Sequence, residues 1–82
     1  MTNRPQLLVV DDEAGIRESL ETLLTLEGYA VEMATDGESG LALIDQKSYD
    51  LVLLDLALPG QNGIEILPQI RERQPEIGRA HV

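Results

Sequence analysis

Three aspartates follow two short apolar runs, and their placement indicates a site for a hard cation. Asp11 and Asp12 come directly after residues 7–10, and Asp55 comes directly after residues 51–54. If both runs are parallel strands, they end at the same edge of the sheet, and the three carboxylates meet there. Crowded carboxylates repel one another, and such clusters commonly hold Mg²⁺, which prefers oxygen ligands. Each acid alone is more simply a strand end or helix cap; the three together favour a metal-assisted site.

The apolar pattern along the chain predicts three βα units in sequence. In chain order the expected elements are a strand over 6–10, a helix over roughly 14–26, a strand over 29–34, a helix that starts within 35–38 and runs to about 46, a strand over 51–54 and a helix from about 64 to before 75. Right-handed crossovers then give a parallel three-stranded sheet with helices on both faces. The α/β class therefore follows from the order of the elements.

Each expected helix has an apolar side that should face the sheet. In the first helix this stripe comprises Ile16, Leu20, Leu23 and Leu24, with Asp12 or Glu13 as a cap. In the third helix it comprises Ile64, Leu67 and Ile70. We expect these stripes to form the core.

Composition narrows the possible partners and the compartment. Six basic and fifteen acidic residues give a net charge of −9, which argues against a basic patch for nucleic acid or anionic membranes. The chain has no cysteine, so disulfides and thiolate zinc sites are excluded. No apolar run approaches the roughly 20 residues that span a bilayer, and the N-terminus lacks a signal-peptide core. We expect a cytoplasmic, single-domain protein with no direct nucleic-acid binding and no membrane association.

Three motifs stand in a fixed order along the chain. Residues 8–13 read Leu-Val-Val-Asp-Asp-Glu, residues 36–43 open the second helix, and residues 55–63 run from an aspartate to a glycine. In this order and spacing they resemble the receiver domains of two-component response regulators, over about residues 6–75. The resemblance implies a flavodoxin-like, doubly wound fold with parallel strands in the order 2-1-3.

The resemblance also implies a role for each site residue. Asp55 would be the phosphoacceptor, taking a phosphoryl group from a histidine of a sensor kinase or from a small phosphodonor. Asp12 would bind Mg²⁺ directly, Asp11 directly or through water, and the backbone carbonyl of Ala57 would supply a further ligand. The implied function is a signalling switch linked to transcriptional regulation.

Two features of the family are missing from the sequence. Receivers continue through a fourth strand that ends in Ser or Thr and a fifth that ends in Lys, but no Ser or Thr follows Ser48, and Lys47 is the only lysine. We therefore expect a truncated receiver that fills residues 1–82 as one partial domain. Its recognisable part is 6–75, and the tail over 76–82 is either the start of a fourth strand or sequence foreign to the domain.

Truncation leads to a competing hypothesis. The apolar third strand would become an exposed edge, and such edges pair with other chains. The alternative is thus a fragment without phosphotransfer activity that forms a dimer or exchanges elements through residues 51–54. A phosphatase with an aspartyl nucleophile is disfavoured, because its general acid would stand at the position of Ala57. We expect a module that is not an enzyme.

Overall fold

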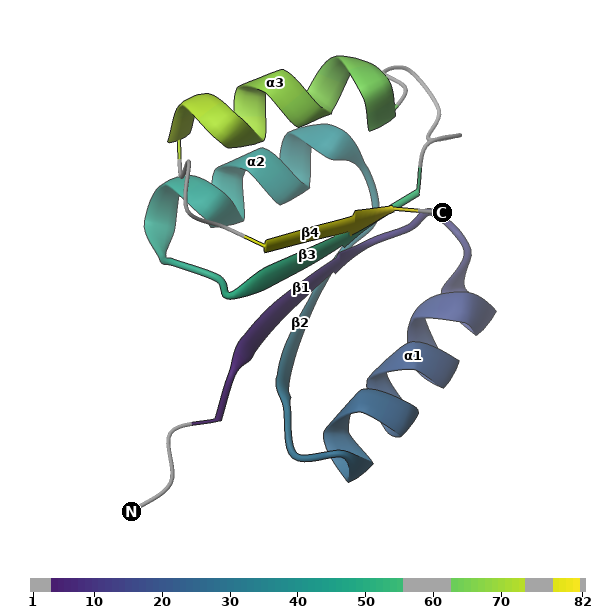
Figure 1. Cartoon of the computed structure of the whole chain (residues 1–82). Helices are drawn as coiled ribbons and strands as arrows, with labels where there is room; N and C mark the ends of the chain where they lie inside the picture. The colour runs from purple at the N-terminus through teal and green to yellow at the C-terminus, as the bar shows by residue number, and fades with distance from the viewer. Residues whose placement is uncertain (1–3, 56–62, 74–77, 82) are drawn as a thin grey trace.

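Four parallel strands form one sheet in the order β2-β1-β3-β4 in the computed structural model of the chain (Figure 1). The strands are β1 (Gln6–Val10), β2 (Ala30–Ala34), β3 (Leu51–Leu54) and β4 (Gly78–His81). The structure describes residues 4–55, 63–73 and 78–81, with the backbone alone for 63, 64 and 78–81. The predicted order 2-1-3 is confirmed, and β4 extends it.

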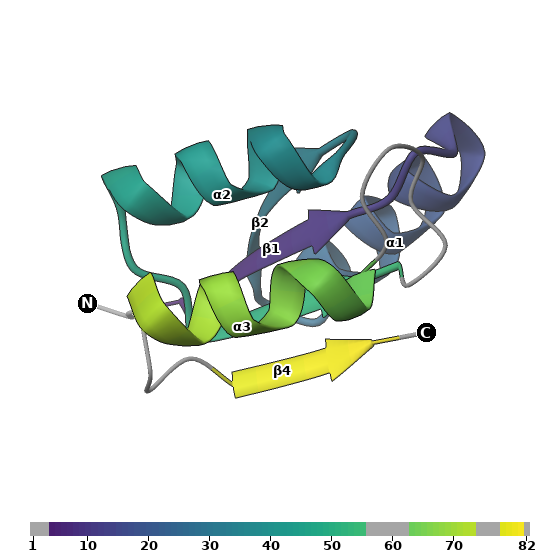
Figure 2. The same ribbon diagram turned by 90° about the horizontal axis from the view of Figure 1, so that it is seen from above.

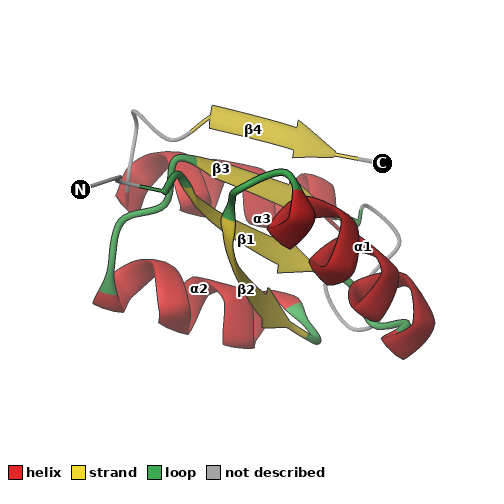
Figure 3. Ribbon diagram, turned by 90° about the horizontal axis from the view of Figure 1, so that it is seen from below, coloured by secondary structure: helices red, strands yellow, loops and turns green. Residues whose placement is uncertain are grey.

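Helices cover both faces of the sheet and make three layers. Helix α1 (Ala14–Leu26) lies on one face, and α2 (Gly37–Gln46) and α3 (Gly63–Arg73) lie side by side on the other (Figures 1 and 2). The view from below shows α1 in front of the sheet (Figure 3). Among the helices of the described residues, none is long and apolar enough to cross a membrane.

The pairing of β4 with β3 corrects one expectation from the sequence. Leu51 pairs with Gly78 and Leu54 with His81, so β3 has a neighbour on each side. The third strand is therefore not an exposed edge, so the expectation of a bare edge was wrong, while association of the chain with itself stays a prediction. The backbone of residues 78–81 supplies the partner strand, in a segment whose sequence is compatible with either the start of a fourth strand or sequence foreign to the domain.

Most of the core lies between the sheet and the pair α2 and α3. Its members are Leu8, Val10, Ala34, Leu41, Ile44, Tyr49, Val52, Leu54, Ile66 and Ile70. Side chains alternate between the two faces of the sheet along β1, so Leu7 and Val9, which are also buried, point to the face opposite Leu8 and Val10. In α3 the buried pair is Ile66 and Ile70, four residues apart, whereas the predicted stripe omitted Ile66. The side chain of Ile64 lies outside the described residues.

Helix α1 is less buried than its apolar stripe predicts. It has no buried residue, and Ile16 and Leu23 are 42% and 60% exposed. The helix packs on β2 and β1, and its packing on the rest of the sheet is weaker. The apolar stripe of α1 therefore covers more of the helix surface than the part that packs on the sheet. The expectation that all four of its residues would enter a core was wrong.

Local backbone geometry and a side-chain cap define the end of α1 and the start of α2. Helix α1 stops at Gly28, whose φ of 98° is the left-handed conformation that glycine adopts readily. Asp36 caps the start of helix α2, because its Oδ1 accepts a hydrogen bond from the Ser39 N–H at 2.7 Å. A Cβ on Gly40 would lie 3.0 Å from Val10 Cγ2, so this glycine lets α2 approach the end of β1 closely.

A polar cluster joins β2 to the connection between α2 and β3. The Tyr49 hydroxyl donates to Glu32 Oε1 at 3.2 Å, and Lys47 forms an ion pair with the same carboxylate. The Lys47 ammonium also lies 5.6 Å from the centroid of the Tyr49 ring. The hydrogen bond from Lys47 lowers the pKa of Glu32, while burial and the nearby Glu32 charge raise the pKa of Tyr49 to about 12.

Candidate metal centre

The register of the central strands brings the acidic residues to one edge. Val10 pairs with both Ala34 and Leu54, so β1, β2 and β3 end at the same level. The chain then continues into Asp11 after β1 and into Asp55 after β3. Two backbone bonds extend the pairing past the strands, since Asp11 N–H donates to Ala34 O at 3.1 Å and Asp55 N–H donates to Val10 O at 3.0 Å. These bonds fix the backbone of both aspartates.

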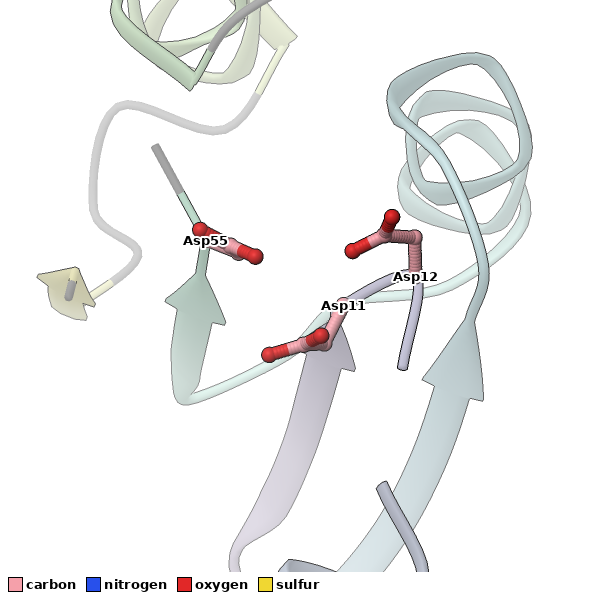
Figure 4. Close-up of side chains that lie close together, drawn as sticks. All are labelled: Asp11, Asp12 and Asp55. Atoms are coloured by element: carbon pink, nitrogen blue, oxygen red, sulfur yellow. The ribbon is translucent and has the colours of Figure 1, made fainter. Parts of the chain in front are cut away.

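The three carboxylates converge as the sequence predicts. Asp11, Asp12 and Asp55 each offer an oxygen, and these oxygens all lie within 4.8 Å of one another. Figure 4 shows the Asp55 side chain at the end of β3 with the Asp11 and Asp12 side chains nearby. Asp11 is 4% exposed, whereas Asp55 is half-buried and Asp12 is exposed. Ala57, whose carbonyl was the fourth predicted ligand, lies outside the described residues.

The donor set fits a small divalent cation. Mg²⁺ binds oxygens at about 2.0–2.1 Å, so two ligands on opposite sides of the ion are at most about 4.2 Å apart. Carboxylate oxygens that all lie within 4.8 Å of one another can reach one such ion directly, after small side-chain movements, or with one ligand that binds through water. Three negative charges at this spacing repel one another, and a cation between them removes that repulsion. Their role as metal ligands remains a prediction.

Asp11 is held at three points by groups from different elements. Its N–H bonds to Ala34 of β2, its Oδ1 accepts from the Glu13 N–H at 2.9 Å, and its carbonyl accepts from Arg17 Nη1 at 2.7 Å. The expected cap of α1 is not formed, because Glu13 occupies the cap position without a side-chain hydrogen bond and no acid lies in the first turn. The Asp11 and Asp12 carboxylates instead lie with that of Asp55, and Asp11 Oδ1 bonds within the loop.

Sequence reasoning missed Arg17. It is the only basic residue of α1, and it lies six residues after Asp11, within reach of the loop that carries the first two aspartates. The sequence did hold a signal for Arg17. It is a single positive charge on an otherwise acidic helix, close to the predicted metal ligands.

Comparisons with known proteins agree with the fold. A family model described as the response regulator receiver domain matches residues 7–81. The transcriptional regulatory protein ResD of Bacillus subtilis is 48% identical over 73 residues, which is 89% of this chain and 30% of ResD. The chain thus spans less than a third of the curated relatives it matches.

Solved structures give the same answer with higher coverage. A CheY-like receiver domain protein from Methanospirillum hungatei superposes with a TM-score of 0.94 at 33% identity, over 96% of this chain and 63% of that one. TrrA from Thermotoga maritima, solved in complex with Mg²⁺ and BeF, gives 0.87 at 40% identity, over 92% and 65% of the two chains. A second TrrA structure, in complex with the histidine kinase ThkA, gives 0.88 at 39% identity, over 94% and 66%.

Proposed function

The chain belongs to the response regulator receiver domain family, and from that premise we propose that Asp55 accepts a phosphoryl group. The convergence of Asp55 with Asp11 and Asp12 at one edge of the sheet carries this proposal. The complex of TrrA with Mg²⁺ and BeF supports it, because TrrA is 40% identical to this chain.

The proposed step is a phosphoryl transfer from a histidine. A carboxylate oxygen of Asp55 attacks phosphorus, an O–P bond forms, and the P–N bond of the phosphohistidine breaks. The bonding electrons go to the imidazole nitrogen, which takes up a proton. Asp11 and Asp12 form no bond to phosphorus and act by holding the cation.

Charge is the main obstacle to this step, because a carboxylate must approach an anionic phosphoryl group. Bound Mg²⁺ would neutralise oxygen charge on both partners, which is its usual contribution to phosphoryl transfer. Asp11 and Asp12 would hold the ion together with Asp55 and the backbone carbonyl of Ala57. The buried Asp11 is fixed by its backbone bonds, and the exposed Asp12 supplies the most accessible ligand.

We propose a sensor histidine kinase as the partner that supplies the phosphoryl group, as the TrrA complex with ThkA supports. The relationship to ResD, a transcriptional regulatory protein, supports a link to the control of transcription. On this proposal the domain acts in the cytoplasm and serves as a switch and not as an enzyme with a released product.

Labelling with a small phosphodonor tests the role of Asp55. The chain is incubated with acetyl phosphate and Mg²⁺, and intact-mass spectrometry should detect one added phosphoryl group. Asp55→Asn should abolish the added mass. Asp50→Asn is the matched control, because Asp50 precedes β3 as Asp55 follows it, and it should be labelled as the unmutated chain is. A folded, unmutated chain that takes no label in the presence of Mg²⁺ contradicts the proposal.

The second candidate is a domain without phosphotransfer activity that associates with itself. Two observations favour it: Lys47, the only lysine of the chain, is engaged by Glu32, and α1 leaves Ile16, Leu23 and Leu26 exposed. With β3 paired to β4, a dimer would form through the α1 face and not through the third strand. Sedimentation of the unmutated chain and of Leu23→Glu tests this, and a monomer for the unmutated chain at micromolar concentration would exclude it.

A further inference from the structure

The guanidinium of Arg17 lies at the loop that carries two of the three acids. Arg17 Nη1 donates to the carbonyl oxygen of Asp11 at 2.7 Å, and Arg17 is half-buried in this position. A bond from a charged donor is short and about twice as strong as one between neutral groups. It joins the first turn of α1 to the residue that follows β1.

The bonded carbonyl belongs to the peptide between Asp11 and Asp12. The orientation of this peptide sets the direction in which the Asp12 side chain leaves the backbone. Asp12 is exposed, so packing around its side chain does little to hold it. Asp11, by contrast, is also held through its N–H and its carboxylate. The hydrogen bond from Arg17 therefore constrains the Asp11–Asp12 peptide, which the bonds to the Asp11 N–H and carboxylate do not hold.

We propose that Arg17 is a positioning residue for the cation site, and that it holds the Asp11–Asp12 peptide so that both carboxylates face Asp55. This inference rests on the proposed function only for the identity of the cation. It extends the site to a residue of α1 that touches neither the cation nor the phosphoryl group.

The sign of one measurement separates positioning from simple electrostatics. A positive charge near the three carboxylates repels a cation, so on charge alone the loss of Arg17 should tighten Mg²⁺ binding. If Arg17 sets the geometry of the ligands, its loss should weaken binding, as does the loss of groups that orient metal ligands. The two effects oppose each other and cannot be confused.

Calorimetric titration with Mg²⁺ on the full chain makes this measurement. Arg17→Met keeps an apolar stem, removes the donor and should weaken Mg²⁺ binding about tenfold. Arg17→Lys keeps a charged donor and should recover part of that loss. Arg71→Met is the matched control, because Arg71 is an exposed arginine of α3 whose loss changes the net charge equally. It should leave Mg²⁺ affinity unchanged or slightly tighter.

Hydrogen exchange gives a second readout that does not depend on bound metal. The bond from the Glu13 N–H to Asp11 Oδ1 spans the Asp11–Asp12 peptide, so release of that peptide in Arg17→Met should weaken the bond and accelerate exchange of the Glu13 amide, while amides of β1 keep their protection. A double-mutant cycle then locates the effect: in an Asp12→Asn background the loss caused by Arg17→Met should be small, because the ligand that it positions is gone.

Two results would overturn the inference, namely Mg²⁺ binding by folded Arg17→Met as tight as or tighter than that of the unmutated chain, or unchanged exchange of the Glu13 amide. Failure of the proposed function is separate, since it is read from phosphoryl labelling of the unmutated chain. A chain that binds Mg²⁺ with the predicted dependence on Arg17 but takes no label on Asp55 would support positioning and refute phosphotransfer.

Discussion

Replacement of Asp12 by asparagine should stabilise the chain in the absence of divalent cations. The Asp12 oxygen lies within 4.8 Å of those of Asp11 and Asp55. At this separation Coulomb's law gives about 0.9 kcal/mol of repulsion per pair in water, and about 3.5 kcal/mol at an effective dielectric constant of about 20. Because Asp12 is exposed, the value for water applies more closely, and the two pairs together predict a gain of about 1–2 kcal/mol.

Urea denaturation followed by circular dichroism measures this gain. At low salt without Mg²⁺, Asp12→Asn should unfold at a higher urea concentration than the unmutated chain. The gain should shrink near 1 M salt, where the screening length falls to about 3 Å. Added Mg²⁺ should reverse the order, because the unmutated chain binds the ion more tightly and binding stabilises the folded state.

Glu21→Gln is the control for the change in net charge, since Glu21 is an exposed acid in the middle of α1. It should shift the midpoint little at either salt concentration. Equal or lower stability of Asp12→Asn at low salt without Mg²⁺ would refute the reasoning, because the three carboxylates would then not be under mutual repulsion.

Two further predictions concern single residues away from the site. Burial and the Glu32 charge raise the pKa of Tyr49 to about 12, so in Tyr29→Phe the remaining tyrosine should ionise near that pH by ultraviolet absorbance. Its contribution to stability is complete below pH about 10 and is lost as the pH rises toward 12; a midpoint near 10 in the folded chain would contradict this. Neither Gly15 nor Gly28 has an atom within 4 Å of a built Cβ, but Gly28 has a φ of 98°. In thermal denaturation, Gly15→Ala should stabilise by about 1 kcal/mol and Gly28→Ala should destabilise by about 1–2 kcal/mol; the same sign for both would exclude this explanation.

The strands and the convergence of the acids were predictable because they depend on short-range patterns. The run over Leu51–Leu54 is apolar at every position, which is typical of a strand buried on both faces. Parallel pairing then places the residue after each strand at a common edge, so Asp55 and Asp11 meet without any knowledge of side-chain packing. The end of α1 is also a short-range feature, because glycine, here Gly28, commonly follows the last turn of a helix.

Features that depend on the distance between elements were not predictable. Apolar spacing shows that Ile16 and Leu23 share a side of α1, but not how far the sheet extends beneath that side. The hydrogen bond from Arg17 depends on the rotamer of a long side chain and on the path of the loop. The pairing of β4 needed the backbone of a segment whose residues have no clear periodicity.

The helices cover the two faces of the sheet unequally, and this predicts the order in which parts of the domain unfold on heating. No residue of α1 is itself buried, whereas α2 and α3 enclose most of the core, so α1 should detach in a local opening of lower free energy than global melting. Since Arg17 moves away with α1, the affinity of the site for the cation would fall while the core stays intact. Release of bound Mg²⁺ below the temperature at which the core melts would be the sign of this order, and simultaneous loss of both would exclude it.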